Sequence, residues 1–292
     1  MDTERLKNSI KLLNKKFNGN IVPFGKSLNN INVNFIPTNN KKLDDILCGG
    51  LPEGRLVELH GHESTGKTTL AYYLCSQFEY SAFIDAEGTF DEERAKLFNN
   101  RPGHLIINRP DNGEEAIETI IEFINAGVPF IVIDSIPALY PIKQQEKDVG
   151  KEEFSPVARL MSQQFLPKVE PALKKNKSIV FCINRLRDNI VSFGHAEPFI
   201  TLGGKALRYA FSVRIELARK GWLGATKDTR YGLLQSYRVV KSKVATPYKV
   251  CEFPFIWDHG YCETVEEAKD IRKSLLVEKR NKTKKKKKER NI

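Results

Sequence analysis

Runs of apolar residues alternate with amphipathic segments through the middle of the chain. The short runs rich in β-branched or aromatic residues, typical of buried strands, cover residues 55–60, 81–87, 104–110, 129–136 and 178–184. Helical spacing fills the intervals, near residues 67–78, 91–99, 113–126 and 156–175. Elements in this order predict an α/β fold with a mostly parallel central sheet and helices on both faces.

The pattern changes after residue 205, where strand-like segments follow one another without long helices between them. They cover residues 211–219, 233–243 and 248–257, and we expect them to extend the sheet in antiparallel fashion. A short helix near residues 264–278 leads into a lysine run. This run has too many like charges to fold alone, so we expect a disordered basic tail.

The N-terminal segment has a helical periodicity of its own. Leu6, Ile10, Leu13 and Phe17 share one face of an amphipathic helix predicted over residues 4–17, before an Asn-rich connector. Such a helix can pack on a neighbouring subunit or fold back on its own core, and the pattern fits both.

Composition is that of a soluble globular protein, since 40% of the 292 residues are hydrophobic and 28% are charged. No apolar run approaches the roughly 20 residues of a membrane span. The polar start is not that of a secretory signal, so we expect a cytoplasmic location. The net charge is +11, and residues Lys279 to Ile292 supply most of it with nine basic residues against one acidic residue.

The segment Gly61–Thr69 reads GHESTGKTT, a complete GxxxxGK[ST] phosphate-binding loop. It lies between a predicted strand and a predicted helix, so backbone N–H groups and the helix dipole would hold phosphate there. The glycines permit the tight path of the loop. The residues expected to contact a nucleoside triphosphate are Gly61, Glu63, Ser64, Thr65, Gly66, Lys67, Thr68 and Thr69.

The mechanics of this motif assign roles to two of its side chains. Lys67 reaches the β- and γ-phosphates, and the Thr68 hydroxyl is a Mg²⁺ ligand. Asp134 follows the apolar strand that begins near residue 129. Because ligands bind at the carboxyl ends of parallel strands, Asp134 is expected to hold the Mg²⁺ shell, directly or through water. The alternative is an aspartate that caps the next turn.

Two more carboxylates, Asp85 and Glu87, end the strand candidate at residues 81–87 and point to the same face of it. Attack on a γ-phosphoryl group needs a carboxylate that positions or deprotonates water. Glu87 is the better candidate because it lies at the mouth of the sheet. Both could instead be solvated strand-end acids.

Several segments of the chain occur in the order found in RecA-type strand-exchange recombinases. They are GHESTGKTTL, FIDAEGTFD, RPDNGEEA, VIDSIPAL and GGKALRYAFSVRIEL. From about Asn14 to Gly260 the chain resembles this family, including the compact recombinases of bacteriophages. The resemblance implies a RecA-like P-loop ATPase that uses ATP and Mg²⁺ and forms a helical filament on single-stranded DNA. It also implies homologous pairing and strand exchange with duplex DNA.

The resemblance extends to individual catalytic residues. Glu87 matches the carboxylate that activates the attacking water, and Lys241 and Lys243 match two lysines that reach across the subunit interface to the γ-phosphate. From the residues alone, these lysines share one face of a strand and could stabilise a transferring phosphoryl group. They could equally be ordinary exposed lysines.

Two segments, residues 141–155 and 185–204, lack regular patterning, and long loops inside a compact domain are usually functional. By the resemblance they hold single-stranded DNA at the filament axis. The candidates for DNA contact are Arg159, Arg185, Arg187, Lys205 and Arg208 for phosphates, Ile190, Phe193 and Phe199 for bases, and Gly203 and Gly204 for close backbone approach.

The chain departs from the family at several positions. Arg185 stands where bacterial RecA proteins carry a glutamine that senses the γ-phosphate, and arginine donates hydrogen bonds but accepts none. Arg94 stands where they place a tyrosine against adenine, and its guanidinium plane can stack on a base. We expect no globular C-terminal domain and no acidic tail, so duplex capture would pass to the lysine run.

The predicted organisation is an N-terminal oligomerisation helix and linker (residues 1–30), an ATPase core (31–260), and a short helix with a Lys-rich tail (261–292). Alternative functions on the same fold are a hexameric DNA helicase and a non-catalytic accessory protein that binds ATP. Expected partners are single-stranded DNA, homologous duplex DNA, further copies of the chain, and single-strand-binding and mediator proteins, with no membrane. The expected site of action is the nucleoid, or the host cytoplasm for a viral chain.

Overall fold

The computed structural model describes residues 3–16, 33–100, 103–145, 156–188 and 199–289. The chain divides into two units, residues 1–34 and Phe35–Ile292. The first unit contains α1 (Thr3–Lys16), which confirms the N-terminal helix. No residue of α1 is buried, and Leu6, Leu12 and Leu13 are exposed.

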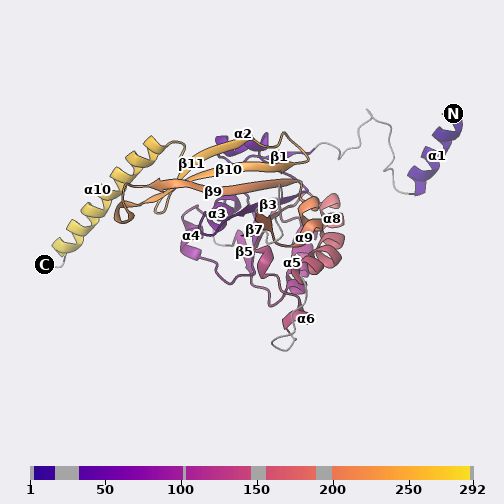
Figure 1. Cartoon of the computed structure of the whole chain (residues 1–292), viewed down its shortest axis with the longest axis horizontal. Coiled ribbons are helices and arrows are strands. Elements are labelled where there is room, and N and C mark those ends of the chain that lie inside the picture. The colour runs from indigo at the N-terminus through magenta and orange to yellow at the C-terminus, as the bar shows by residue number, and fades with distance from the viewer. Residues whose placement is uncertain (1–2, 17–32, 101–102, 146–155, 189–198, 290–292) are drawn as a thin grey trace. The chain divides into compact units, whose positions relative to one another are not determined.

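The second unit is built on one large sheet with the strand order β12-β11-β10-β9-β3-β7-β6-β4-β5 (Figure 1). The parallel strands are β3 (Leu56–Gly61), β4 (Ser81–Asp85), β5 (Leu105–Asn108), β6 (Phe130–Asp134), β7 (Ile179–Asp188) and β9 (Val213–Leu223). The antiparallel extension adds β10 (Gly232–Ser242), β11 (Val250–Ile256) and β12 (Gly260–Tyr261). The predicted parallel sheet with an antiparallel extension is confirmed.

Helices cover both faces of the sheet because its central strands are apolar on both sides. One face carries α2 (Lys41–Leu47), α3 (Lys67–Cys75) and α4 (Glu92–Lys96). The other carries α5 (Gly113–Asn125), a π-helical turn (Met161–Phe165), α8 (Leu166–Lys175) and α9 (Gly204–Ala210). In β6, Phe130 and Val132 join the first core while Ile131 and Ile133 join the second.

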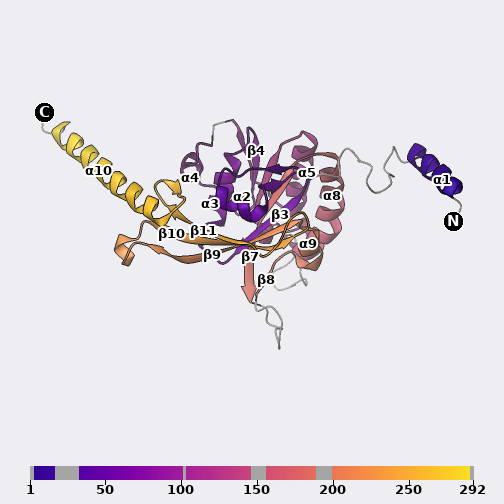
Figure 2. The same ribbon diagram turned by 90° about the horizontal axis from the view of Figure 1, so that it is seen from above.

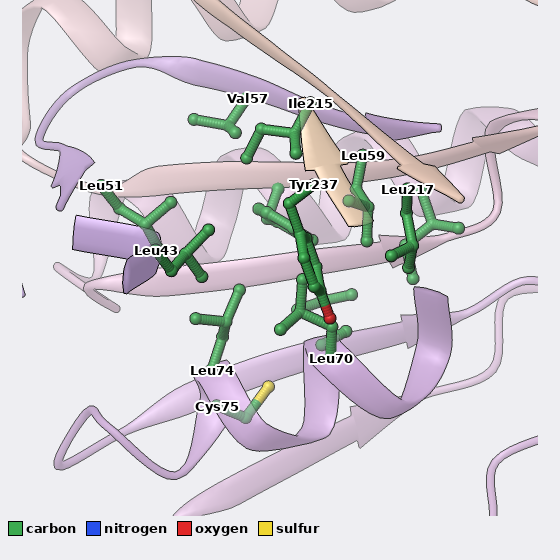
Figure 3. Packing of buried hydrophobic residues seen from close by; sticks show 14 of the residues in the cluster. Leu43, Leu51, Val57, Leu59, Leu70, Leu74, Cys75, Ile215, Leu217 and Tyr237 are labelled. Atoms are coloured by element: carbon green, nitrogen blue, oxygen red, sulfur yellow. The ribbon is translucent and has the colours of Figure 1, made fainter. Parts of the chain in front are cut away.

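The first core holds α3 rigidly against the sheet. Leu70 and Leu74 of α3 pack among residues of β3, β9 and β10, including the fully buried ring of Tyr237 (Figure 3). Burying α3 in this way fixes the loop that precedes it.

The remaining short elements are β1 (Phe35–Ile36), β2 (Leu51–Pro52), α6 (Ile142–Gln145) and α7 (Pro156–Leu160).

The prediction that residues 185–204 lack regular structure was wrong. β7 continues through Asp188, and its end pairs in antiparallel register with β8 (Phe199–Thr201), which leaves the main sheet (Figure 2). Residues 185–188 and 199–204 are therefore a hairpin base and a helix start rather than unpatterned loop. Arg185 and Arg187 occupy exposed positions of this strand, which is completed by pairing with residues further along the chain, as in Leu186 with Thr201.

The expectation of a disordered tail was also wrong, since α10 (Val265–Glu289) continues through most of the lysine run. Its first turns pack against β11 and β9, where Ala268 joins Leu223, Ile256 and Cys262 in a small core. Lysine is a good helix former, and a helix already nucleated by packing gains one hydrogen bond for each added residue. These terms outweigh the repulsion between neighbouring charges.

Within the part of the chain that the structure describes, no helix is both long enough and apolar enough to cross a bilayer. All five cysteines are free thiols.

Candidate active site

The phosphate-binding loop joins β3 to α3, as its sequence predicts. Gly66 caps α3 with φ = 97°, a left-handed conformation that suits glycine, and Ser64 is also left-handed at φ = 58°. A β-carbon at Gly66 would collide with the Gln235 side-chain amide, and one at Gly61 with the Leu217 carbonyl oxygen. Both glycines are therefore required by close approach of β10 and β9.

Lys67 and Thr68 begin α3 and point in different directions. The Lys67 amine donates to the carbonyl oxygens of Gly61 (3.0 Å) and His62 (2.8 Å), and burial lowers its pKa. The Thr68 hydroxyl donates to Oδ2 of Asp134, 2.7 Å away at the end of β6. The two side chains expected to hold Mg²⁺ are thus together.

Asp134 ends β6 and is buried. Its pKa is raised to about 6, chiefly by burial and also by the nearby Glu87 and Asp85 carboxylates, against the lowering effect of the Thr68 hydrogen bond. A buried carboxylate beside a hydroxyl is the oxygen donor set that Mg²⁺ takes, usually with water and phosphate completing the shell. These residues therefore fit the cation, which would relieve the cost of burying the carboxylate charge.

Glu87 lies just beyond β4, beside Asp134. Its backbone N–H donates to the Asp134 carbonyl oxygen (3.2 Å), and its carboxylate accepts one hydrogen bond from the Ser135 hydroxyl and another from Arg185 Nη2 at 2.6 Å. Arg185 stands opposite Gly61 in the register of β3 and β7. The candidate carboxylate, the phosphate loop and the strand leading to the predicted second DNA loop therefore meet at one point.

A cavity of about 410 Å³ opens beside this pair. Glu87 and Arg185 line it together with Asn112, Leu139 and Tyr140. The cavity gives solvent access to the Glu87 carboxylate, which a residue that orients water requires.

Asp85 has a structural role instead. It is buried, and its carboxylate accepts hydrogen bonds from the backbone N–H groups of Thr89 (2.9 Å) and Phe90 (3.1 Å) and from Arg109 Nε (2.9 Å). These bonds shape the turn that places Glu87. The assignment of Glu87 to the attacking water stays a prediction.

The polar positions of β3 are buried. Glu58 is fully buried and accepts hydrogen bonds from Arg214 Nε (2.5 Å) and Asn184 Nδ2 (2.9 Å). Burial alone raises its pKa, but His60 and Arg214 together hold it below the usual value. Arg214 also donates to Thr201 of β8, so this cluster joins the strand of the phosphate loop to the hairpin base.

Lys241 and Lys243 lie near the end of β10, away from the phosphate loop of their own chain. The Lys241 amine donates to the carbonyl oxygens of Arg208 (2.8 Å) and Tyr209 (2.9 Å), and that of Lys243 to Ala210 (3.3 Å). These carbonyls belong to the last turn of α9. Burial, with the charges of Lys243 and Arg214, lowers the pKa of Lys241 to about 8.

Arg94 lies on α4, and its Nη1 donates to the Trp257 carbonyl oxygen at 2.8 Å. This bond ties α4 to the end of β11. The predicted contact of Arg94 with adenine stays a prediction.

The predicted DNA-contact residues surround the β7–β8 hairpin and its continuation. Arg187 pairs in register with Ile200, and the half-exposed Phe199 packs edge-on against His62 of the phosphate loop with ring centroids 4.9 Å apart. Gly203 caps α9 in a left-handed conformation, which Gly204 also adopts. The remaining candidates are Lys205 and Arg208 on α9 and Arg159 on α7, while Ile190 and Phe193 lie outside the described residues.

Sequence reasoning missed two residues that support the site. Ser135 donates to Glu87, and the only available signal was its place directly after Asp134. Gln235 of β10 donates through Nε2 to the carbonyl oxygen of Thr65 (2.5 Å) in the phosphate loop. A polar residue in a strand gives no sign that it is buried.

Comparison with known proteins adds to this geometry. A family model described as "RecA N-terminal domain" matches residues 4–262. The chain is 36% identical over 249 residues to Protein RecA of Symbiobacterium thermophilum, covering 83% of this chain and 70% of the relative. It is 40% identical over 237 residues to Protein RecA of Cytophaga hutchinsonii (79% and 66%) and 38% identical over 261 residues to that of Aquifex aeolicus (86% and 74%).

Proposed function

The chain belongs to the RecA family, and from this premise we propose how its own residues carry out the family's reaction. It is a DNA-dependent ATPase of homologous recombination that uses ATP and Mg²⁺. It forms filaments on single-stranded DNA and exchanges strands with duplex DNA. The family assignment does not support the helicase or accessory alternatives.

The phosphate loop binds the triphosphate through its backbone N–H groups, with Lys67 turning from its carbonyl partners onto the β- and γ-phosphates. Thr68 and Asp134 hold Mg²⁺, supported by their 2.7 Å contact. The cation supplies charge neutralisation on the phosphate oxygens.

Glu87 orients and deprotonates the attacking water. Ser135 holds one of its oxygens, and Arg185 holds the other. The Arg185 side chain is largely exposed, so this ion pair is weak enough for a γ-phosphate to compete for the guanidinium. Transfer of Arg185 to phosphate frees Glu87 for water and pulls on the end of β7, which leads to the second DNA loop.

Lys241 and Lys243 complete the nucleotide site of the neighbouring protomer. They are anchored to the C-terminal carbonyls of α9, the helix that follows the β7–β8 hairpin. A rearrangement of the hairpin on DNA would therefore reposition the lysines. The same coupling makes ATP turnover depend on DNA.

The hairpin base supplies the DNA-facing residues of each protomer. Arg187, Lys205 and Arg208 neutralise phosphates, and Phe199 stacks on bases at the point where it touches His62. In this proposal α1 contacts the next protomer, the basic end of α10 attracts duplex DNA, and single-strand-binding and mediator proteins help loading. The family is cytoplasmic, and work on the nucleoid is part of the proposal.

The observation that carries the proposal is the meeting of Glu87, Asp134 and Arg185 at the mouth of the phosphate loop. A strand-exchange assay between a homologous single strand and duplex tests it. Exchange should require ATP and should accompany helical filaments in electron micrographs. Closed rings without exchange would favour the helicase, and neither rings nor filaments would favour the accessory protein.

A further inference from the structure

The Gln235 side chain occupies an unusual place for an amide. It is fully buried in β10, among apolar residues that pack α3 onto the sheet. A buried amide is costly unless its hydrogen-bonding capacity is used. The amide nitrogen and oxygen of Gln235 therefore both require hydrogen-bond partners.

Both ends of the amide have such partners. Nε2 donates to the Thr65 carbonyl oxygen at 2.5 Å, and Oε1 accepts from the Tyr237 hydroxyl at 2.8 Å. A carbonyl oxygen can only accept, so the amide nitrogen must face Thr65. Burial raises the pKa of Tyr237 well above its usual value, so that hydroxyl keeps its proton.

The bond to Thr65 sets the direction of a phosphate-binding N–H group. The peptide between Thr65 and Gly66 is planar and trans, so its N–H points opposite to its C=O. When Gln235 holds the Thr65 carbonyl toward β10, the Gly66 N–H points away from β10. Gly66 has no β-carbon, and one would strike Gln235 Nε2, so loop and amide fit each other closely.

The strand is irregular where it makes this contact. The register of β9 against β10 shifts between Leu234 and Gln235 and again between Val239 and Lys241. Such irregularities re-aim side chains and occur often beside active sites. Here the first shift lies at the residue that touches the phosphate loop.

We propose that Gln235 is a positioning residue of the nucleotide site, which holds the phosphate loop in its binding shape from the antiparallel extension. This inference rests on the proposed function only in assigning the loop to ATP. Gln235 itself touches no substrate, so its contribution is to nucleotide affinity rather than to the chemical step.

The test substitutes Gln235→Met, which keeps the volume but cannot donate. It should weaken binding of a fluorescent ATP analogue in Mg²⁺ about tenfold, because a loop that is no longer held by Gln235 must be ordered at the expense of binding free energy, about 1.4 kcal/mol for a tenfold change. The KM for ATP should rise by a similar factor, with kcat at saturating ATP within about twofold of wild type. Unchanged affinity would overturn the proposal.

Thr38→Val is the matched control, because it also removes a side-chain hydrogen bond of a buried residue, from Thr38 Oγ1 to Asp44 Oδ1 at 2.7 Å, outside the loop. It should lower thermal stability without changing affinity, and an equal loss of affinity in this variant would overturn the proposal. Should Gln235→Met fail to fold, Tyr237→Phe frees only Oε1 and should weaken affinity about threefold. Absence of ATPase activity in the wild type would contradict the proposed function while leaving the binding comparison readable.

Discussion

The parallel half of the sheet and its antiparallel extension contribute to the active site in different ways. In the parallel half, the residues of the site lie where strands end: Asp134 ends β6 and Glu87 follows β4. In the extension they lie within a strand, where Gln235 and Lys241 are carried by β10 beside register shifts. The parallel half thus places its site residues together at one edge of the sheet, whereas the antiparallel extension contributes single side chains from within a strand.

This difference has a physical origin. Parallel strands all present their carboxyl ends at one edge, so that loops there converge on a ligand without special geometry. Antiparallel strands have no common edge. A residue of the extension reaches a site only when a bulge or an unusual burial directs it, and β10 directs Gln235 toward its own phosphate loop and Lys241 toward α9.

The largest effect is expected at the strand-end edge. Glu87→Gln should lower DNA-dependent ATP turnover by about 100-fold or more, because general-base catalysis contributes about 10²- to 10⁴-fold. ATP affinity should change little, since Glu87 binds water rather than phosphate. Steady-state turnover and analogue binding measure the two quantities. Turnover at the wild-type rate would remove Glu87 from its role, and Ser135→Ala should give a smaller loss in the same direction.

Asp85 lies at the same edge of the sheet as Glu87, but it supports the turn after β4 and takes no part in the chemistry. Asp85→Asn should lower the free energy of unfolding by about 2 kcal/mol, since buried backbone N–H groups lose a charged acceptor. Denaturant unfolding measures this change. At temperatures where the variant stays folded, ATP affinity should match the wild type. A stable variant would show that the turn does not depend on the carboxylate.

The extension makes a pH-dependent contribution. Lys241 has a pKa of about 8, below the usual lysine value, so above pH 8 its amine is mostly neutral in the free protomer. It must then take up a proton to engage an anionic phosphate, so turnover should fall by up to about tenfold per pH unit above 8. Lys241→Arg, which stays charged, should flatten the profile between pH 7 and 9.5. Parallel profiles in both proteins would place Lys241 outside the site.

The smallest expected effect lies beyond the sheet, in the basic end of α10. Deleting residues 279–292 should weaken duplex-DNA affinity about fivefold at physiological salt and reduce its salt dependence, because fewer phosphates are neutralised. ATP turnover on single-stranded DNA should remain near the wild-type rate. An unaltered slope of log affinity against log salt would reduce this segment to a solubility device.

The same contrast between strand ends and strand interiors explains which site residues could be predicted from the sequence. Gly61 to Thr69, Glu87 and Asp134 were predictable because their motifs and strand ends are local patterns. Gln235 was not, because it belongs to no motif and a single glutamine in a strand gives no local sign of its hydrogen-bond partner. Its burial depends on α3 covering that face, which only the fold reveals.

Irregular pairing limited the prediction elsewhere. The β7–β8 hairpin depends on contacts between Leu186 and Thr201 and between Arg187 and Ile200, pairs that are distant in sequence. The ion pair of Arg185 with Glu87 likewise joins residues that no local pattern connects. The position of Arg185 could be read from the resemblance, but its ion pair with Glu87 could not.

The central claim is that the strand-end edge of one protomer and the β10 lysines of its neighbour form one site. Mixing Glu87→Gln and Lys241→Met proteins on single-stranded DNA tests this most directly. Each variant alone should be inactive, but in a random equimolar mixture about a quarter of the head-to-tail interfaces combine an intact Glu87 with an intact Lys241. The mixture should therefore regain ATP turnover at about a quarter of the wild-type rate. A mixture as inactive as its components would contradict the claim.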